Sequence, residues 1–119
     1  MTNITVCGAM GRMGKSIIGV VDRDPKTRLV GAIEANRHPM IGSVIGRSVK
    51  VTDDLKSVIV KTGVIIDFSS PEATLKNLAV AVKHKKPYII GATGFSEAEL
   101  KTIKKAAAVI PVAISPTGA

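Results

Sequence analysis

Short apolar runs rich in β-branched residues alternate with segments of helical periodicity, and this alternation restricts the fold more than any other feature of the chain. The runs cover residues 4–7, 29–33, 49–51, 64–67, 88–90 and 110–114. Strands that alternate with helices build βαβ units, whose strands lie parallel in one sheet. The sequence therefore predicts an α/β fold, a doubly wound Rossmann-type parallel sheet, in which residues 1–119 form a single domain.

Two of the helical segments carry clear start signals. Ser70 before Pro71 is typical of a helix N-terminus, and Ser96 stands three residues before Glu99, the spacing of a capping box. We expect the second of these helices to bury the apolar residues Leu100, Ile103 and Ala107.

Two other segments have weaker signals. Residues 54–60 are predicted to form a helix between the third and fourth runs. Residues 35–48 contain Pro39, Gly42 and Gly46 and are predicted to be an irregular connection.

The composition is that of a globular protein in a reducing compartment. Hydrophobic residues make up 45% and charged residues 22% of the chain, which is ordinary for a domain with a packed core. The one cysteine, Cys7, cannot form an internal disulfide and is interpreted as a buried small hydrophobe. The longest apolar runs fall far short of the roughly 20 residues that cross a bilayer. No basic leader precedes the first run, so we expect a cytoplasmic protein without a membrane partner.

The net charge of +8 raises the question of an anionic partner. Many lysines are dispersed within or beside the predicted helices: Lys76, Lys83, Lys85, Lys86, Lys101, Lys104 and Lys105. There is no helix-turn-helix pattern and no aromatic stacking platform, so we expect anionic small molecules, and no nucleic acid, as partners. Neither a Ser/His/Asp set nor a metal-ligand spacing occurs, which leaves hydrolase and metalloenzyme chemistry without support.

A glycine-rich turn joins the first run to the first helix. Its sequence, Gly8-Ala9-Met10-Gly11-Arg12-Met13-Gly14, has a glycine at every third position. In a Rossmann fold the first glycine allows the tight turn, the second lets phosphates approach, and the third lets the helix pack closely against the sheet. A dinucleotide's pyrophosphate would meet backbone N–H groups and the positive end of the helix dipole there.

Glu34 directly follows the second run, twenty residues beyond Gly14, and is placed to accept hydrogen bonds from a ribose diol. Arg37 could reach a 2'-phosphate, although solvation in a loop competes with that role. Arg12 lies either near the phosphates or on the surface. In the alternative interpretation, the glycines only form a tight turn without a ligand, and Glu34 is a solvated residue at the end of a strand. The pattern as a whole predicts a site for NADH or NADPH.

Two more loops follow predicted strands at the edge where ligands bind in open α/β sheets. They are residues 67–71 and residues 91–95. In the second loop, glycines let the backbone approach a flat ring, and Thr93 offers a hydroxyl to an amide. In the first loop, Phe68 either lines the site or fills the core. Asp67 is interpreted as a helix-capping or loop-bracing carboxylate in preference to an acid or base.

Three segments, in this order, resemble the N-terminal domain of the 4-hydroxy-tetrahydrodipicolinate reductase family, whose members are also called dihydrodipicolinate reductases. They are residues 6–14 (VCGAMGRMG), residues 66–74 (IDFSSPEAT) and residues 90–95 (IGATGF). The resemblance covers nearly the whole chain. It implies an NAD(P)H-dependent oxidoreductase that transfers hydride to a cyclic imine-type substrate in lysine and diaminopimelate biosynthesis.

The resemblance also implies roles for single residues. It assigns the pyrophosphate to the glycine turn, the adenosine ribose to Glu34 and the nicotinamide to the loop after the fifth run. The cofactor-binding residues implied are Gly8, Ala9, Met10, Gly11, Arg12, Met13, Glu34, Phe68, Gly91, Ala92, Thr93, Ser115, Pro116 and Thr117. No catalytic residue and no metal ligand is assigned.

The chain departs from the family in four ways. Ala35 stands where many members have an arginine, which weakens the case for a 2'-phosphate contact and favours NADH. Ala92 lacks the hydroxyl of the usual Gly-Thr-Thr-Gly loop, and residues 115–119 replace the usual Ala-Pro-Asn segment. The family's substrate-binding, tetramer-forming domain has no counterpart, so we expect a truncated chain that binds cofactor without turnover, as a monomer or weak dimer. The alternative is a nucleotide-sensing regulatory Rossmann module.

Overall fold

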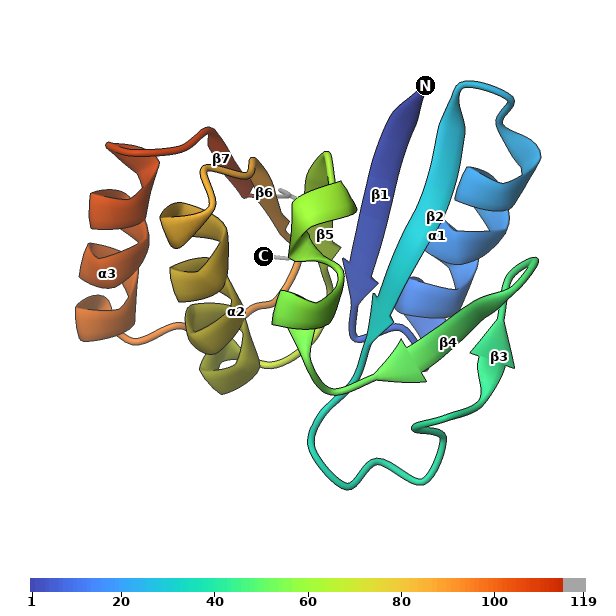
Figure 1. Ribbon diagram of the computed structural model, residues 1–119. Helices are drawn as coiled ribbons and strands as arrows, with labels where there is room; N and C mark the ends of the chain where they lie inside the picture. Colours follow the sequence, from blue (N-terminus) through green and yellow to red (C-terminus); the bar gives the residue numbers. More distant parts are fainter. Residues whose placement is uncertain (115–119) are drawn as a thin grey trace.

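The computed structural model describes residues 1–114 and shows a seven-stranded sheet with helices on both faces (Figure 1). The sheet order is β3-β4-β2-β1-β5-β6-β7, and all neighbours are parallel except β3 and β4. The strands are β1 (Thr2–Cys7), β2 (Thr27–Ile33), β3 (Val44–Ile45), β4 (Val49–Thr52), β5 (Val64–Asp67), β6 (Tyr88–Ile90) and β7 (Val112–Ile114). The helices are α1 (Arg12–Arg23), α2 (Pro71–Lys83) and α3 (Glu97–Ala107). The prediction of a doubly wound Rossmann-type parallel sheet is confirmed.

Each face of the sheet has its own core. α1 covers one face, where its buried Ile18 and Val21 pack with Val6 of β1 and Leu29 of β2. α2 and α3 lie side by side over the other face (Figure 1), where Leu78 and other buried residues cover β5 and β6. Because helices cover both faces of the sheet, the central strands consist of continuous apolar runs in the sequence. Among the described residues, no helix combines the length and apolarity needed to cross a membrane.

The helix start signals are confirmed. The Ser70 hydroxyl accepts a hydrogen bond from the Ala73 amide at 3.2 Å. At α3, the Glu99 amide donates to the Ser96 hydroxyl at 3.1 Å, and the Ser96 amide donates to the Glu99 carboxylate at 2.8 Å, which completes the capping box.

The prediction for the buried face of α3 is partly wrong. Ile103 is buried as predicted, together with Ala106. Ala107 is exposed. In a helix of 3.6 residues per turn it lies about 100° round the axis from the buried Ala106, which turns it away from the core. Leu100, in the first turn, is 46% exposed.

The α-helix predicted over residues 54–60 is absent, and two short 3-10 helices take its place, η1 (Leu55–Ser57) and η2 (Ile59–Lys61). The Asp54 carboxylate accepts from the Lys56 amide at 3.1 Å, and the Ser57 hydroxyl donates to the Asp54 carbonyl at 2.7 Å. The amides of Ser57 and Val58 donate to the carbonyls of Asp54 and Leu55, three residues back, instead of forming the i→i−4 bonds of an α-helix.

The strands also differ from the prediction. β1 and β2 each begin two residues earlier, at Thr2 and Thr27, and β4 ends one residue later, at Thr52. Residues 44–45, within the predicted irregular connection, form β3 by pairing antiparallel with β4. The last strand starts at Val112 instead of residue 110. The Ile110 amide donates to the Ala106 carbonyl at the end of α3, and Pro111 has no N–H to donate to a neighbouring strand.

The turn after β1 requires glycine at two positions. Gly8 has a φ of +74°, and a Cβ there would stand 2.8 Å from the backbone carbonyl carbon of Phe68. A Cβ at Gly14 would overlap the carbonyl oxygen of Gly8 and stand 2.9 Å from its carbonyl carbon. These close approaches bring β1, the first turn of α1 and the loop after β5 together.

Two glycines of α1 allow a matched test of this packing. Gly14→Ala should lower the free energy of unfolding by about 1–3 kcal/mol, because the new methyl group meets fixed backbone. Gly19→Ala should raise it by about 0.5–1 kcal/mol, because its Cβ would meet only the flexible Arg23 side chain, at 3.4 Å, while alanine favours the helix. Urea denaturation followed by circular dichroism measures both. Equal effects of the two substitutions would contradict the close approach at Gly14.

Candidate functional site

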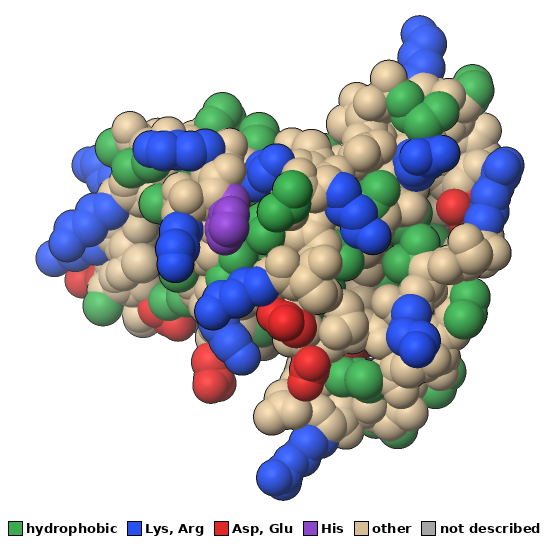
Figure 2. Space-filling model, viewed as in Figure 1, with side chains coloured by type: hydrophobic (Ala, Val, Ile, Leu, Met, Phe, Trp, Pro, Cys, Tyr) green, Lys and Arg blue, Asp and Glu red, His purple; other side chains and the backbone are tan. Residues whose placement is uncertain are grey.

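The candidate site lies at the carboxyl edge of the sheet, between β1 and β5. The chain leaves β1 toward β2 and β4 on one side and returns to β5 on the other, so the strand order reverses at this point. A cavity of about 760 Å³ opens there. Figure 2 shows a hollow at the lower edge of the molecule, between the side built on α2 and the loop after β2. Ligands of open α/β sheets bind in such crevices.

The structure brings five of the predicted residues to this cavity, namely Gly8, Met10, Gly11, Glu34 and Phe68. Ala9 is fully buried instead, and Arg12 and Met13 lie exposed on the first turn of α1. Gly91, Ala92 and Thr93 form the neighbouring loop and do not line the cavity. Ser115, Pro116 and Thr117 lie outside the described residues.

Most backbone amides of the glycine turn are already used within the protein. The amides of Gly8 and Ala9 donate to the Ile33 carbonyl, and the Gly11 amide donates to the Gly8 carbonyl at 3.2 Å. The Met10 amide donates to the Glu34 carboxylate at 2.8 Å.

The next three amides, those of residues 12–14 in the first turn of α1, have no partner within residues 1–114. Gly11 precedes them without a side-chain cap, and a Cβ at that position would meet only the Gly8 carbonyl, at 3.5 Å. The positive end of α1 is therefore open where a phosphate could approach, an arrangement that fits a diphosphate.

Glu34 has a structural role that the sequence did not predict. One carboxylate oxygen accepts from the Met10 amide at 2.8 Å, and the other accepts from the Ala35 amide at 3.1 Å. The side chain therefore braces the glycine turn. Because a carboxylate has about four acceptor positions, Glu34 can still accept bonds from a diol.

Asp67 braces the loop after β5, which confirms its interpretation as a loop-bracing residue. Its carboxylate is fully buried and accepts from the Ser69 amide at 2.7 Å, from the Ser69 hydroxyl and from the Tyr88 hydroxyl. The Asp67 carbonyl accepts from the Gly91 amide at 2.7 Å. The loops after β5 and β6 are thus tied together.

Phe68 strengthens this link. A Cβ at Gly91 would overlap ring atoms of Phe68 and stand 2.7 Å from its Cζ. The half-buried ring therefore lies directly on the backbone of the loop after β6, and it also lines the cavity.

The sequence interpretation missed several residues that line the cavity. They are His38 and Asp53 from the loops after β2 and β4, and Lys76 and Asn77 from the second turn of α2. A signal for the last two existed, because a helix that starts at the carboxyl edge of a sheet brings its first turns to the ligand crevice. His38 and Asp53 depend on the course of loops that the sequence pattern left undefined.

Cys7 and Tyr88 lie buried beneath this edge. Burial raises the pKa of the Cys7 thiol well above its ordinary value, and the nearby Asp67 carboxylate raises it further, against a hydrogen bond from Tyr88. Burial also raises the pKa of Tyr88, with added effects of Cys7 and Asp67. Cys7 is therefore a neutral, packed thiol. Within residues 1–114, no group of three His, Cys, Asp or Glu side chains is placed to hold a metal ion.

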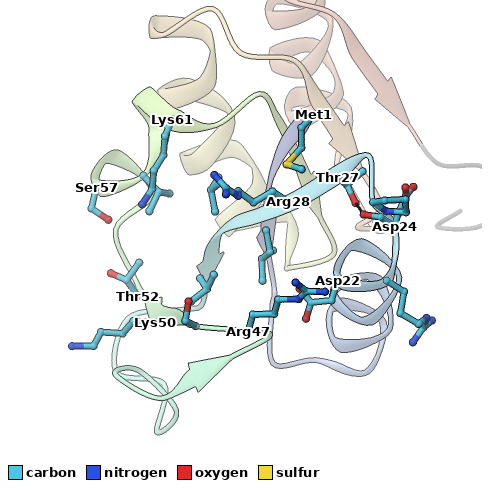
Figure 3. A pocket seen from close by; sticks show the side chains of 17 residues that line it. Met1, Asp22, Asp24, Thr27, Arg28, Arg47, Lys50, Thr52, Ser57 and Lys61 are labelled. Atoms are coloured by element: carbon cyan, nitrogen blue, oxygen red, sulfur yellow. Dashed lines mark hydrogen bonds between the residues drawn. The ribbon is translucent and has the colours of Figure 1, made fainter.

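A second cavity, of about 930 Å³, lies at the amino end of β2. Figure 3 shows basic side chains from β2, β4 and η2 around it, among them Arg28, Lys50 and Lys61. It contains none of the predicted site residues, and it faces away from the edge where open α/β sheets bind cofactors. Its larger volume therefore does not make it the candidate site.

The raised pKa values predict how the buried pair responds to reagents and to pH. Native protein at about pH 8, near the ordinary pKa of a thiol, should leave Cys7 unmodified by a small aromatic disulfide, whereas guanidinium-unfolded protein should react with one thiol per chain. Full reaction of native protein would show that the thiol is accessible and ionised.

Stability should also fall in alkali. The Cys7 thiol and the Tyr88 hydroxyl both have a higher pKa in the folded protein than in the unfolded protein. Their contribution to the free energy of unfolding is therefore fully present below the unfolded-state pKa values. It is lost as the pH rises through the folded-state pKa values. Tyr88 is the only tyrosine, so tyrosinate absorbance reports it alone and should appear together with unfolding. Ionisation at the ordinary pKa in folded protein would contradict its burial.

Comparison with known proteins gives a consistent result. The sequence profile of the family described as "Dihydrodipicolinate reductase, N-terminus" matches residues 2–117. A 4-hydroxy-tetrahydrodipicolinate reductase of Citrifermentans bemidjiense is 40% identical over 123 aligned positions, covering 98% of this chain and 46% of that protein. One from Psychrobacter arcticus is 40% identical and covers 94% of this chain and 43% of that protein. The chain spans about half the length of the curated relatives it matches.

The fold has a counterpart among solved structures. A dihydrodipicolinate reductase from a Paenisporosarcina species, solved with dipicolinate bound, superposes with a TM-score of 0.80 at 22% identity. The superposition covers 98% of this chain and 47% of that chain. At this identity the likeness supports the fold alone.

Proposed function

Since the chain belongs to the dihydrodipicolinate reductase family, whose N-terminal part it matches, we propose that it binds NADH or NADPH at the cavity between β1 and β5. In this proposal it holds the hydride donor for the reduction of 4-hydroxy-tetrahydrodipicolinate, the substrate in the names of its relatives. The observation that carries the proposal is that Gly11 and Glu34 line one cavity, next to the first turn of α1, whose amides have no partner within residues 1–114.

The diphosphate would bind at the start of α1. The amides of residues 12–14 are its donors, and Gly11 leaves the space for it. Glu34 would accept hydrogen bonds from the adenosine ribose with the acceptor positions that Met10 and Ala35 leave free.

The nicotinamide would lie beside the loop after β6. Gly91 and Ala92 are buried in that loop, the exposed Thr93 offers a hydroxyl to the carboxamide, and Phe68 closes the side toward β5. The bound nicotinamide would supply the hydride. The role of this chain is to bind and orient the cofactor, and we assign no catalytic side chain to it.

We also propose a preference for NADH over NADPH. A 2'-phosphate would stand beside the Glu34 carboxylate, and like charges at such a distance repel. The residue that follows is Ala35, which offers no compensating charge.

On the same basis, residues 1–119 act as the dinucleotide-binding domain, and turnover needs a substrate-binding, tetramer-forming part that they do not include. The chain should therefore bind NADH with negligible reduction of substrate. Nicotinamide fluorescence, substrate turnover and sedimentation measure binding, activity and oligomeric state. Binding of NAD⁺ as a signal, with no hydride transfer when the remaining part of a reductase is supplied, would favour a regulatory module instead.

Calorimetric titrations of NADH and NADPH test the assigned ribose contact. Glu34→Ala should weaken NADH binding at least about tenfold, or about 1.4 kcal/mol, because it removes both the diol acceptor and the brace on the Met10 amide. Glu34→Gln keeps an acceptor for that amide but loses the charge, so it should weaken NADH binding less and improve NADPH binding. NADH binding that is the same in all three proteins would exclude this role of Glu34.

A further inference from the structure

The Asp67 carboxylate is a buried anion whose donors are all neutral. It is fully buried, and the three groups that donate to it are the Ser69 amide, the Ser69 hydroxyl and the Tyr88 hydroxyl. An ionised carboxylate only accepts hydrogen bonds, so three donors match its charged form.

Asp67 lies next to the start of the loop after β6. It is in register with Ile90, and its carbonyl accepts from the Gly91 amide at 2.7 Å. Its carboxylate accepts from the hydroxyl of Tyr88 on β6, and the Phe68 ring packs on Gly91. The buried Asp67 and the buried Gly91 are therefore neighbours across two adjacent strands.

The oxidised nicotinamide ring carries a positive charge, and the reduced ring is neutral. A buried anion in a medium of low dielectric constant acts on such a ring with little screening by salt. We propose that Asp67, in addition to bracing its loop, stabilises the oxidised nicotinamide and thereby favours hydride donation by NADH. This inference rests on the proposed function, because it places the ring beside Gly91–Thr93.

A purely structural role of Asp67 makes a different prediction. Loss of a brace would weaken every ligand of the cavity alike, including ADP-ribose, which lacks the nicotinamide. Loss of a charge would weaken NAD⁺ selectively and change the ratio of the NAD⁺ and NADH dissociation constants.

Calorimetry with NAD⁺, NADH and ADP-ribose separates the two roles. Asp67→Asn is isosteric and neutral, and it should weaken NAD⁺ relative to NADH about tenfold, or about 1.4 kcal/mol, while ADP-ribose binding stays unchanged. Tyr88→Phe is the matched control, because it removes a donor to Asp67 and leaves the charge. It should leave the NAD⁺ to NADH ratio at the wild-type value.

If the ratio of the NAD⁺ and NADH dissociation constants is unchanged in Asp67→Asn, or changes equally in Tyr88→Phe, the inference about Asp67 is overturned while the proposed function stands. Wild-type protein that binds none of the three ligands would overturn the proposed function and the inference with it. If circular dichroism shows that Asp67→Asn does not fold, Asp67→Ser, which is also neutral and is smaller, is measured in its place. It should weaken NAD⁺ relative to NADH in the same way, and an unchanged ratio of the two dissociation constants there would also overturn the inference.

Discussion

The contact between Gly14 and Gly8 is the constraint on which the rest of this structure depends. Any side chain at position 14 would occupy the place of the Gly8 carbonyl, so only glycine lets α1 begin directly against the end of β1. That start leaves the amides of residues 12–14 at the carboxyl edge of the sheet without partners in the described part of the chain. The same turn also packs on the backbone of Phe68, which joins β1 to the loop after β5.

The edge is held together by acidic side chains. Glu34 ties the end of β2 to the glycine turn through the Met10 amide, and Asp67 ties the loops after β5 and β6 through Ser69 and Tyr88. Buried or half-buried carboxylates that accept backbone bonds fix the shape of a site before a ligand arrives. In the proposed function this preorganisation lowers the cost of ordering loops when the dinucleotide binds.

The sequence was most informative where the signal was local. The glycine turn, the Ser70 cap and the Ser96–Glu99 capping box depend on neighbouring residues, and the structure has all three. β3 could not be predicted, because two residues become a strand only by pairing with β4. Leu55 and Ile59 have the spacing of an α-helix, yet the amides of Ser57 and Val58 donate three residues back, to the carbonyls of Asp54 and Leu55, as in a 3-10 helix. The glycine turn and the end of β2 were predicted to lie close together. The hydrogen bond from the Met10 amide to the Glu34 carboxylate, which joins them, was not predicted.

The most direct test of the account is a backbone amide NMR titration with NADH. The account predicts that the largest shifts belong to residues 12–14 and Glu34, with smaller shifts in the loop of residues 91–93. Shifts confined to Arg28, Lys50 and Lys61, around the second cavity, would contradict it, as would amides of residues 12–14 that do not respond at saturating ligand.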